Sequence, residues 1–461
     1  MFTGFKEKIA RLSTKLRSPW QIKSQYPAPG LYHYEHRTEY EKSRLHLRVD
    51  PDHSGLLLVN ANRVIHLNPT AVFMAYLVLE DYSQEHAIQG ITSTFQVSAS
   101  QAAADYQKYS NQFSELIRPD GACPIHELGI ETVMPFTTRP SAPYRMDLAL
   151  TYRCNNGCSH CYNARPRSYQ ELSTGEWFKI LDHLWDLAIP HIVFTGGEPT
   201  LRSDLPELIA YAERNGQITG LNTNGRRLND MDYLDQLVDA GLDHVQITLE
   251  SHDPGIHDKM VCTKGAWQQT VAGIRNALDT PLYMMTNTTM LKDNSPRMES
   301  TLNFLADIGV PTLGLNALIY SGHGLSVGTG LAETDLPPLL ELARTSTEKN
   351  NQRLIWYTPT QYCHFDPMEL ELGIKGCTAA LYNMCVEPDG AVLPCQSYYQ
   401  PLGNLLTNSW ESIWNHSLSI ALRERTDIPI KCHDCTLLPE CGGGCPLSMN
   451  TNGSRTLISI D

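Results

Sequence analysis

The stretch CNNGCSHC, residues 154–161, decides the fold that this sequence predicts. It presents three thiols at C-x-x-x-C-x-x-C spacing from one tight loop, and it contains no fourth cysteine. Three thiolates can hold three irons of a four-iron cluster and leave one iron open to bind and activate a small molecule. The alternative is a structural zinc loop, but zinc takes four closed ligands, usually paired as C-x-x-C. The spacing therefore favours an iron-sulfur site.

Length and charge limit the classes of protein. At 461 residues the chain is too long for one ordinary domain, and two or three are expected. Asp and Glu number 50 against 36 Lys and Arg, a formal charge of -14 that argues against binding along a nucleic-acid backbone. No apolar run is long enough to span a bilayer, and the N-terminus lacks the apolar core of a signal peptide. We therefore expect no stable membrane insertion and a cytoplasmic location.

The thirteen cysteines are more than packing explains, and a reducing compartment makes disulfides a poor explanation. Three form the triplet, seven fall between residues 377 and 445, and Cys123, Cys262 and Cys363 are scattered. We interpret the grouped cysteines as metal ligands. Cys123 and Cys262 are expected to be small apolar residues, and the alternative for Cys262 is a place in the active-site lining.

The residues before the triplet predict separate modules. Residues 1–27 include an amphipathic basic helix, which we expect to dock on the protein itself rather than on a membrane surface. Residues 28–120 predict strands at 56–60 and 63–67 and then helices at 71–79, 83–94 and 98–117, the first capped near Asn68. A proline-marked linker is expected over residues 121–143.

Strand and helix patterns alternate over residues 144–355. Strands are expected at 146–150, 191–195, 218–222, 244–249, 282–289 and 312–319, and helices at 174–187, 205–215, 231–240, 266–278 and 296–308. Six such units indicate a parallel sheet with right-handed crossovers. Ligands of such sheets lie at the carboxyl ends of the strands, where residues 154–161, 195–199, 222–225 and 248–251 fall. Periodicity alone leaves a flavodoxin-like sheet open.

The triplet, followed by Tyr162 and later by Gly196-Gly197-Glu198-Pro199, resembles the radical S-adenosylmethionine (SAM) enzymes. The resemblance implies an α/β fold with a partial (β/α)6 TIM-like barrel. It implies a 4Fe-4S cluster on Cys154, Cys158 and Cys161, with SAM on the open iron. It also implies an electron donor of the reductase or flavodoxin type, reductive cleavage of SAM, and a 5′-deoxyadenosyl radical that removes hydrogen from the substrate.

The same resemblance implies which residues bind SAM. They are His160, Thr195, Gly196, Gly197, Glu198, Pro199, Thr248, Glu250 and Leu318. Glu198 would accept a hydrogen bond from the SAM ammonium, Thr195 would lie near the methionine carboxylate, and Thr248 and Glu250 near the ribose. His160 and Leu318 would contact the adenine. The family more often has Ser-Leu-Asp where this chain has residues 248–250, TLE. No acid, base or nucleophile is assigned.

Residues 28–120 resemble the small PqqD-like domain called a RiPP recognition element, through the pattern N-x-x-x-V-x-x-L-N at residues 60–68 and the helices that follow. In that family the leader of a ribosomally made precursor peptide adds as a strand to the sheet edge and packs against the last helix. The residue pattern also fits a generic winged-helix module.

Residues 356–461 resemble the SPASM domain, which holds auxiliary iron-sulfur clusters. The resemblance assigns one cluster to Cys377, Cys385, Cys395 and Cys445, and a second to Cys432, Cys435, Cys441 and a ligand after residue 445. The last sixteen residues contain no cysteine. The open alternatives for that ligand are Asp461, Cys363 or an open iron, and we favour a non-cysteine or open site. Zinc knuckles would fit residues 432–445 but leave the three earlier cysteines unexplained.

These three signals together predict a radical SAM/SPASM maturase of a precursor peptide. The expected products are a thioether, a carbon-carbon crosslink or a cyclopropane, because auxiliary clusters suit reactions that remove two electrons. Epimerisation is redox neutral and less expected. One alternative is a sulfatase-maturing type of protein oxidase, which needs no leader-binding domain. Another is a non-catalytic iron-sulfur electron carrier that binds peptide.

Overall fold

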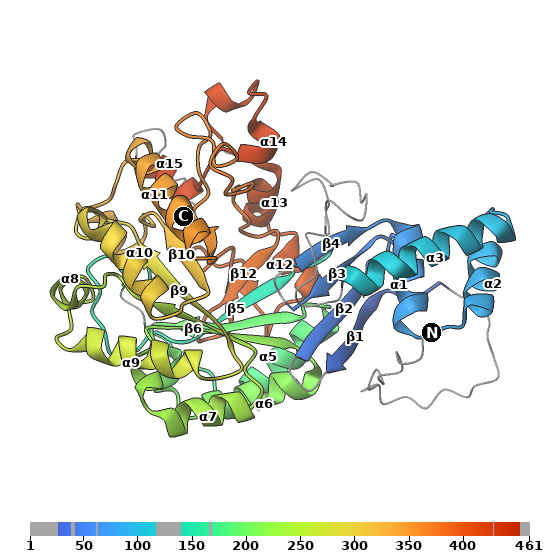
Figure 1. Ribbon diagram of the computed structural model, residues 1–461, viewed down its shortest axis with the longest axis horizontal. Helices are drawn as coiled ribbons and strands as arrows, with labels where there is room; N and C mark the ends of the chain where they lie inside the picture. Colours follow the sequence, from blue (N-terminus) through green and yellow to red (C-terminus); the bar gives the residue numbers. More distant parts are fainter. Residues whose placement is uncertain are drawn as a thin grey trace. The chain divides into compact units, whose positions relative to one another are not determined.

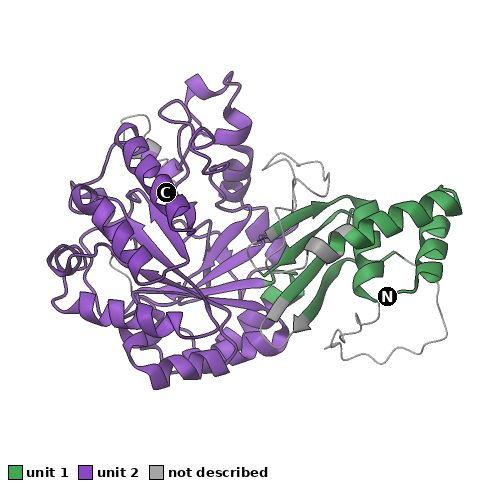
Figure 2. Ribbon diagram, viewed as in Figure 1, with its two compact units in different colours: residues 1–133, 184–190 green, residues 134–183, 191–461 purple. Residues whose placement is uncertain are grey.

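The computed structural model describes residues 26–37, 42–60, 63–116, 140–165, 168–426 and 428–451. The chain forms two compact units, residues 1–133 with 184–190 and residues 134–183 with 191–461 (Figure 2). Almost all of the basic helix expected at residues 1–27, most of the expected linker, Cys123 and Asp461 lie outside the described residues.

The smaller unit contains a four-stranded antiparallel sheet in which each strand pairs with the next along the chain. Its strands are β1 Gly30–Arg37, β2 Lys42–Val49, β3 Gly55–Val59 and β4 Arg63–Leu67. β3 and β4 are the two strands that the sequence predicts, whereas β1 and β2 were not predicted. β1 and β4 are the edge strands of this sheet.

Three helices follow the sheet, as the sequence predicts: α1 Pro69–Leu79, α2 Gln84–Thr94 and α3 Ala99–Leu116. The Asn68 side chain accepts a hydrogen bond from the backbone N–H of Ala71 (2.9 Å), which caps the first turn of α1. Val72 of α1 and Phe113 of α3 pack with Leu47 and other buried residues of the sheet in one apolar core.

The larger unit contains a ten-stranded sheet in the order β11-β10-β9-β8-β7-β6-β5-β12-β13-β14. Its parallel part consists of β5 Arg145–Thr151, β6 His191–Gly196, β7 Ile218–Thr223, β8 His244–Thr248, β9 Tyr283–Thr289, β10 Thr312–Asn316 and β11 Arg353–Trp356. All neighbouring pairs in this part are parallel, so their carboxyl ends share one edge. The sheet is a partial barrel that does not close.

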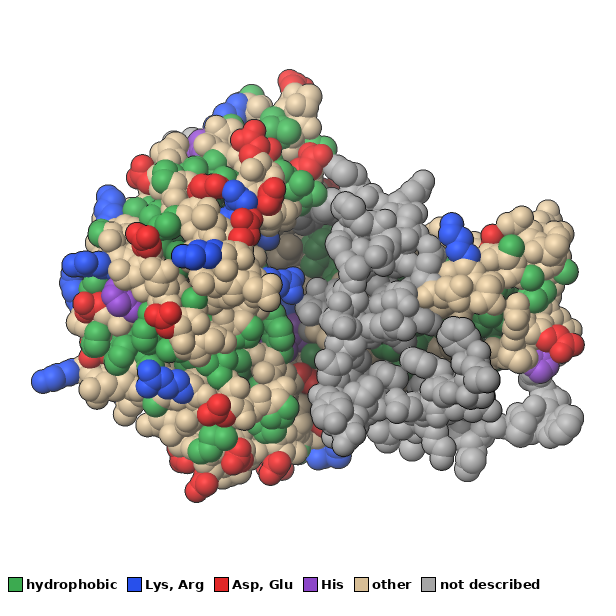
Figure 3. All heavy atoms as spheres, in the orientation of Figure 1, with side chains coloured by type: hydrophobic (Ala, Val, Ile, Leu, Met, Phe, Trp, Pro, Cys, Tyr) green, Lys and Arg blue, Asp and Glu red, His purple; other side chains and the backbone are tan. Residues whose placement is uncertain are grey.

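Helices connect these strands and line the outer side of the curved sheet (Figure 1). They are α5 Thr174–Asp186, α6 Leu205–Asn215, α7 Met231–Asp239, α8 Pro254–Met260, α9 Ala266–Leu278, α10 Met298–Asp307 and α11 Pro337–Lys349. All five predicted helices of this part are present, and α8 and α11 were not predicted. Figure 3 shows acidic and basic side chains interspersed over the visible face of this unit.

The C-terminal segment extends the same sheet. β12 Asn383–Val386 pairs in parallel with β5, and β13 Ala391–Leu393 and β14 Gly403–Asn404 follow in antiparallel order. Short helices complete this part: α12 Trp410–Trp414, α13 Ser417–Glu424, α14 Leu438–Cys441 and α15 Pro446–Thr451. Among the described helices, none has the length and apolar character to cross a membrane.

Candidate functional site

The cysteine triplet lies in the loop that leaves β5 at its carboxyl end. Cys154 is exposed, and Cys158 and Cys161 are half-buried. Burial raises the pKa of the Cys158 thiol well above its ordinary value, and the charges of Glu250, Cys161 and Cys154 raise it further. The three thiols are therefore close enough to interact electrostatically.

Three neighbouring segments hold this loop in place. The backbone N–H groups of Gly157 and Ser159 donate to the carbonyl oxygens of Val261 and Met260, both at 3.0 Å. Arg226 bonds to the Asn155 carbonyl and to the Asn156 side chain. Further along the chain, the His323 N–H donates to the Cys161 carbonyl at 2.9 Å. The loop is thus fixed by the chain itself, which suits a rigid cluster site.

Gly157 differs from the other glycines of the site. A Cβ built there would lie 3.6 Å from the Cβ of Cys262, which is an ordinary contact, so the chain's own packing does not require glycine. Cys262 lies beside the cysteine loop, is exposed and has a positive φ of 51°, so it does not pack like the small apolar residue that we expected.

Gly196 and Gly197 are required by the chain's own backbone. A Cβ on Gly196, whose φ is 137°, would lie 2.2 Å from the Thr151 carbonyl oxygen. A Cβ on Gly197 would lie 2.6 Å from the Arg153 carbonyl oxygen and 2.7 Å from that of Tyr152. The Gly197 N–H donates to the Thr151 carbonyl at 2.7 Å. The two glycines therefore let the end of β6 approach the root of the cysteine loop.

Glu198 is completely buried and joins two loops. Its Oε1 accepts hydrogen bonds from the Thr200 N–H (3.1 Å), the Thr200 hydroxyl (2.6 Å) and the Thr223 hydroxyl (2.7 Å). Its Oε2 accepts one from the Asn224 N–H at 2.8 Å. Burial raises the pKa of Glu198, and these bonds oppose that rise by favouring the carboxylate. Oε2 has one acceptor position beyond its bond to Asn224.

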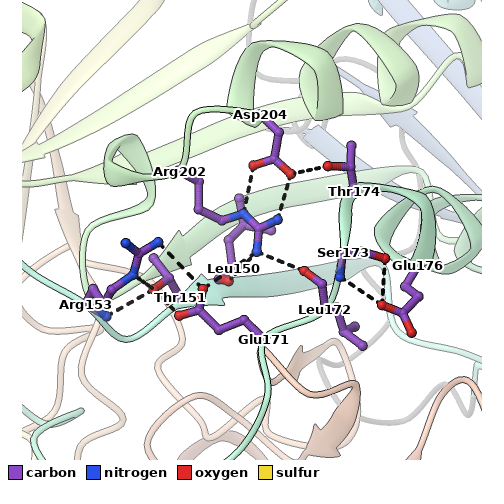
Figure 4. A network of polar contacts seen from close by, with 10 residues as sticks. All are labelled: Leu150, Thr151, Arg153, Glu171, Leu172, Ser173, Thr174, Glu176, Arg202 and Asp204. Carbon is purple, nitrogen blue, oxygen red and sulfur yellow. Dashed lines mark hydrogen bonds and ion pairs between the residues drawn. The ribbon is translucent and has the colours of Figure 1, made fainter.

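Arg202, just after this motif, is the centre of a polar network (Figure 4). Its guanidinium donates to both carboxylate oxygens of Asp204, at 2.8 and 2.6 Å. It also donates to the carbonyl oxygens of Leu150 (3.2 Å) and Leu172 (3.1 Å). Thr174 donates to the same Asp204 carboxylate at 2.7 Å. The network ties the end of β5 to the start of α5 and to the segment that follows Glu198.

His160 and Glu250 form a buried pair. His160 Nε2 lies 2.9 Å from Glu250 Oε1, and Glu250 Oε2 accepts a hydrogen bond from the Thr289 N–H at 2.9 Å. Burial disfavours the charged imidazole, but the charge of Glu250 and its hydrogen bond outweigh burial, so the pKa of His160 is raised. Both carboxylate oxygens of Glu250 therefore have partners within the chain, and one of them sets the ring orientation of His160.

Gln396 connects the SAM motif to the cysteine-rich segment, and sequence reasoning missed it. Its Oε1 accepts hydrogen bonds from the Tyr162 hydroxyl (2.9 Å) and the Thr195 hydroxyl (3.4 Å), and its Nε2 donates to the Gly196 carbonyl at 3.4 Å. The sequence signal that could have identified Gln396 is its position directly after Cys395. The remaining predicted SAM residues lie nearby in the fold: Pro199 is buried after β6, and Thr248 ends β8. Leu318 packs with Met260 and Leu291.

A second polar group lies at the amino ends of the parallel strands. Arg145 donates to Asp147 at 2.7 Å, and His191 Nε2 lies 2.8 Å from His244 Nε2. A Cβ on Gly220 would lie 2.1 Å from the His244 ring, so glycine makes room for that ring. Burial, with a contribution from the charge of Arg145, lowers the pKa of His244 to about 4.

The cysteines assigned to the first auxiliary cluster lie around the start of the C-terminal segment. Burial raises the pKa of Cys377, and the charges of Cys445 and Cys395 raise it further, which places these three thiols near one another. Cys385 is completely buried in β12, and its thiol interacts electrostatically with that of Cys395.

The cysteines assigned to the second auxiliary cluster form another group. Cys432 and Cys435 are linked by the hydrogen bond from the Cys435 N–H to the Cys432 carbonyl (3.2 Å), and Cys441 is buried at the end of α14. Cys441 and Cys435 raise the pKa of Cys432 in addition to burial. Asp461, the fourth candidate, lies outside the described residues.

The donor set fits iron-sulfur clusters better than single ions. Among the described residues, no three His, Cys, Asp or Glu side chains gather closely enough to hold one metal ion. Zinc needs its four ligands around one point, whereas a four-iron cluster takes each thiolate on a separate iron atom.

Two family models match the chain. The radical SAM superfamily matches residues 148–305, and an iron-sulfur cluster-binding domain, SPASM, matches residues 377–436. The first match covers the cysteine triplet and most of the parallel strands. The second begins at Cys377 and ends just after Cys435.

Solved structures share this fold. SuiB of Streptococcus suis bound to its precursor peptide SuiA is 16% identical, with a TM-score of 0.64 over 88% of this chain and 94% of that chain. SuiB bound to S-adenosylmethionine is 15% identical, with a TM-score of 0.66 over 90% and 96%. A structure of anSMEcpe with bound AdoMet is 17% identical, with a TM-score of 0.56 over 68% and 92%.

The radical SAM match includes the two motifs that the sequence singled out. The fold places the cysteine triplet and the Gly-Gly-Glu-Pro turn at the carboxyl ends of neighbouring parallel strands, β5 and β6. Residues 148–305 thus form a radical SAM domain and residues 377–436 a SPASM domain, so the chain is an enzyme whose cofactors are SAM, a 4Fe-4S cluster and auxiliary iron-sulfur clusters.

Proposed function

We propose that the chain is a maturase that modifies a ribosomally made precursor peptide and recognises it through the peptide's leader. The observation that carries this proposal is the antiparallel sheet with edge strands β1 and β4, followed by three helices, in the same chain as the radical SAM and SPASM domains. A sheet edge can take up an extended peptide as an additional strand. The fold shared with SuiB, whose structure holds a precursor peptide, supports the same assignment.

We assign leader binding to the edge at β4. Val64 on this strand is 41% exposed, which is unusual for an apolar side chain on a strand, and it offers a contact for an added strand. Residues 28–120 of the smaller unit would then act as the RiPP recognition element. This assignment predicts that a charge at Val64 weakens leader binding.

At the SAM site, Cys154, Cys158 and Cys161 would hold the radical-generating cluster. When bound, this cluster and SAM supply a 5′-deoxyadenosyl radical that removes a hydrogen atom from the peptide. The chain's residues position these groups. The remaining acceptor position of Glu198 Oε2 would receive the SAM ammonium, and Glu250 would hold His160 in place for the adenine.

The other SAM contacts follow from their places in the fold. Thr195, next to the Gly-Gly turn, is held by Gln396 and would lie near the methionine carboxylate. Thr248 would lie near the ribose, as the sequence suggests, because it ends β8 on the same edge of the sheet. Both carboxylate oxygens of Glu250 already have hydrogen-bond partners, His160 and Thr289. We therefore propose that the main role of Glu250 near the ribose is to position its neighbours.

The auxiliary clusters point to the type of product. Removing one hydrogen atom leaves a peptide radical, and forming a new bond from it releases a second electron that needs an acceptor. Clusters on the C-terminal cysteines could accept that electron and pass it to a flavodoxin-type partner. We therefore propose a thioether, a carbon-carbon crosslink or a cyclopropane, each of which lowers the peptide mass by about 2 units through the loss of two hydrogen atoms.

The test compares a full precursor, taken from the short reading frames beside this chain's gene, with the same peptide lacking its leader. Reconstituted protein is incubated anaerobically with SAM and dithionite, and both 5′-deoxyadenosine and peptide mass are measured. We expect modification of the full precursor only, and none with Cys158→Ala. Equal modification of the leaderless peptide would favour the sulfatase-maturing type, and absence of 5′-deoxyadenosine would favour an electron carrier.

A matched pair of variants tests the leader-binding edge. Val64→Lys places a charge on β4, whereas Val97→Lys makes the same change at a residue that is 39% exposed outside the sheet. Fluorescence anisotropy of a labelled leader should show affinity at least about tenfold weaker for Val64→Lys, which corresponds to about 1.4 kcal/mol, and unchanged for Val97→Lys. Equal affinities would rule out the β4 edge.

A further inference from the structure

One cysteine outside the cysteine-rich motif of residues 432–445 lies beside the second auxiliary site. Cys363 follows β11 and precedes that motif by many residues in the sequence. The Lys431 ammonium lies 3.8 Å from the Cys363 sulfur, and Lys431 directly precedes Cys432. The next residue back, Tyr362, donates its backbone N–H to the Cys441 sulfur at 3.4 Å. Lys431 thus links Cys363 to Cys432, and Tyr362 links it to Cys441.

The Cys363 thiol belongs to the same group as the assigned ligands. The thiols of Cys363, Cys435 and Cys441 each lie close enough to that of Cys432 to interact with it electrostatically.

The segment that carries Cys363 is fixed to the body of the larger unit. Thr360 is 1% exposed, accepts a hydrogen bond from the Trp356 indole at 3.0 Å, and donates its N–H to the Lys375 carbonyl at 3.2 Å. Tyr362 is 6% exposed, and its hydroxyl accepts from the Lys375 N–H at 3.0 Å. Cys441 also contacts this segment, through its thiol and the Thr360 carbonyl at 3.6 Å. The segment that leads to Cys363 is therefore fixed by burial and hydrogen bonds.

We propose that Cys363 is the fourth ligand of the second auxiliary cluster, together with Cys432, Cys435 and Cys441. On cluster assembly the Cys363 S–H bond breaks, its proton passes to water, and the thiolate binds the remaining iron. The positive charge of Lys431 beside this sulfur complements the thiolate. Four cysteine ligands leave no iron open, so this cluster would transfer electrons rather than bind the peptide. The sequence alone favoured a non-cysteine or open site at this position.

This inference rests on the proposed ligand set for the cluster and not on the identity of the substrate. Its test therefore needs neither SAM nor peptide, and its failure would leave the peptide-modifying proposal intact. The readouts are thiol reactivity, iron content and magnetic spectra.

The first measurement uses the unmodified full chain. Cys363 and Cys262 are both exposed, so an uncoordinated thiol at either position should react with iodoacetamide. Under anaerobic conditions we expect the reconstituted protein to be alkylated at Cys262 and protected at least about tenfold at Cys363, measured by peptide mass spectrometry. Removal of iron by a chelator should make Cys363 reactive. Alkylation of Cys363 at the same rate with and without iron would overturn the proposal.

The second measurement uses variants in a chain whose radical SAM cluster is removed by Cys158→Ala. Cys363→Ala and the reference variant Cys435→Ala should change the electron paramagnetic resonance signal of one cluster and lower iron and sulfide by up to roughly four atoms per chain, the content of one 4Fe-4S cluster. Asp461→Ala and Cys262→Ala should leave both unchanged. A full iron content and unaltered signal in Cys363→Ala would contradict the assignment, as would the same spectral change in Asp461→Ala.

Discussion

Replacing Glu198 by glutamine should loosen the two loops that this carboxylate joins. The amide oxygen can replace Oε1 and keep its three donors, but the amide nitrogen then faces the Asn224 N–H across 2.8 Å. One bond to a charged acceptor is lost, which costs about 1.5–3 kcal/mol, and the remaining bonds weaken because their acceptor is now neutral. Relief from burying a carboxylate, the cause of the raised pKa of Glu198, offsets part of this loss.

We expect a net loss of about 1.5–3 kcal/mol in the free energy of unfolding, because the weakened bonds and the relief nearly cancel and the lost bond remains. The assay is anaerobic urea unfolding followed by circular dichroism, without SAM, so that stability is separated from cofactor binding. Glu207→Gln, an equal charge change on the exposed side of α6, is the matched control and should stay within about 0.5 kcal/mol of the unmodified chain. Equal stability of the two variants would refute the structural role given to Glu198.

Three further changes test other parts of the site. Arg202→Leu should lower the free energy of unfolding by about 3–5 kcal/mol, because the half-buried Asp204 carboxylate loses its cation and the carbonyl oxygens of Leu150 and Leu172 lose their donor. Gly197→Ala should cost about 2–3 kcal/mol and weaken SAM binding in equilibrium dialysis, because its methyl group would overlap two carbonyl oxygens. His244 binds a proton near pH 6.5 when unfolded but only near pH 4 when folded, so stability should fall as pH drops through that window. His244→Gln should make this slope smaller in anaerobic thermal unfolding, and the lowered pKa values of His66 and His257 keep part of it.

Each of these changes has a control in the same chain. Arg344→Leu removes only exposed ion pairs and should cost under about 1 kcal/mol. Gly175→Ala, with nothing within 4 Å of the added methyl, should be neutral or slightly stabilising. His86→Gln, at an exposed position, should keep the pH slope of the unmodified chain. A variant that behaves like its control would contradict the corresponding argument.

The sequence predicted the parallel strands and their helices well because local signals mark them. The helix predicted at 205–215 has those bounds in the structure, since Pro206 lies in its first turn and Gly216 ends it with a φ of 90°. The strand predicted to reach residue 319 ends at Asn316 instead, because the Ala317 N–H bonds to the Thr358 hydroxyl at 2.8 Å and Leu318 turns into an apolar cluster. That change of direction depends on residues far along the chain.

The smaller sheet shows a different limit. β2 carries buried Leu45 and Leu47 alternating with Arg44, His46 and Arg48, which are also buried. The alternation was a usable strand signal, but the charged residues made the segment look like solvent-exposed chain. β12 could not be placed from sequence, because its neighbour β5 lies more than two hundred residues earlier.

At the site, motif positions were predictable but hydrogen-bond partners were not. The spacing of the cysteines and the Gly-Gly-Glu-Pro turn located the SAM motif, and the family matches confirm a radical SAM and a SPASM domain. The glycines, which we expected to admit the cofactor, also admit the chain's own carbonyl oxygens from residues 151–153. Gln396 and the pairing of His160 with Glu250 depend on strands meeting at one edge, which no local pattern encodes.

The proposed function requires that this chain generate a radical that removes hydrogen from a precursor peptide. The most direct test supplies a uniformly deuterated precursor to the reconstituted protein with SAM and dithionite, and measures the mass of the 5′-deoxyadenosine formed. We expect deuterium to appear in 5′-deoxyadenosine, in an amount proportional to the amount of modified peptide. Unlabelled 5′-deoxyadenosine in the presence of modified peptide would contradict direct abstraction from the peptide, and an unmodified peptide with no label transfer would contradict the proposed substrate.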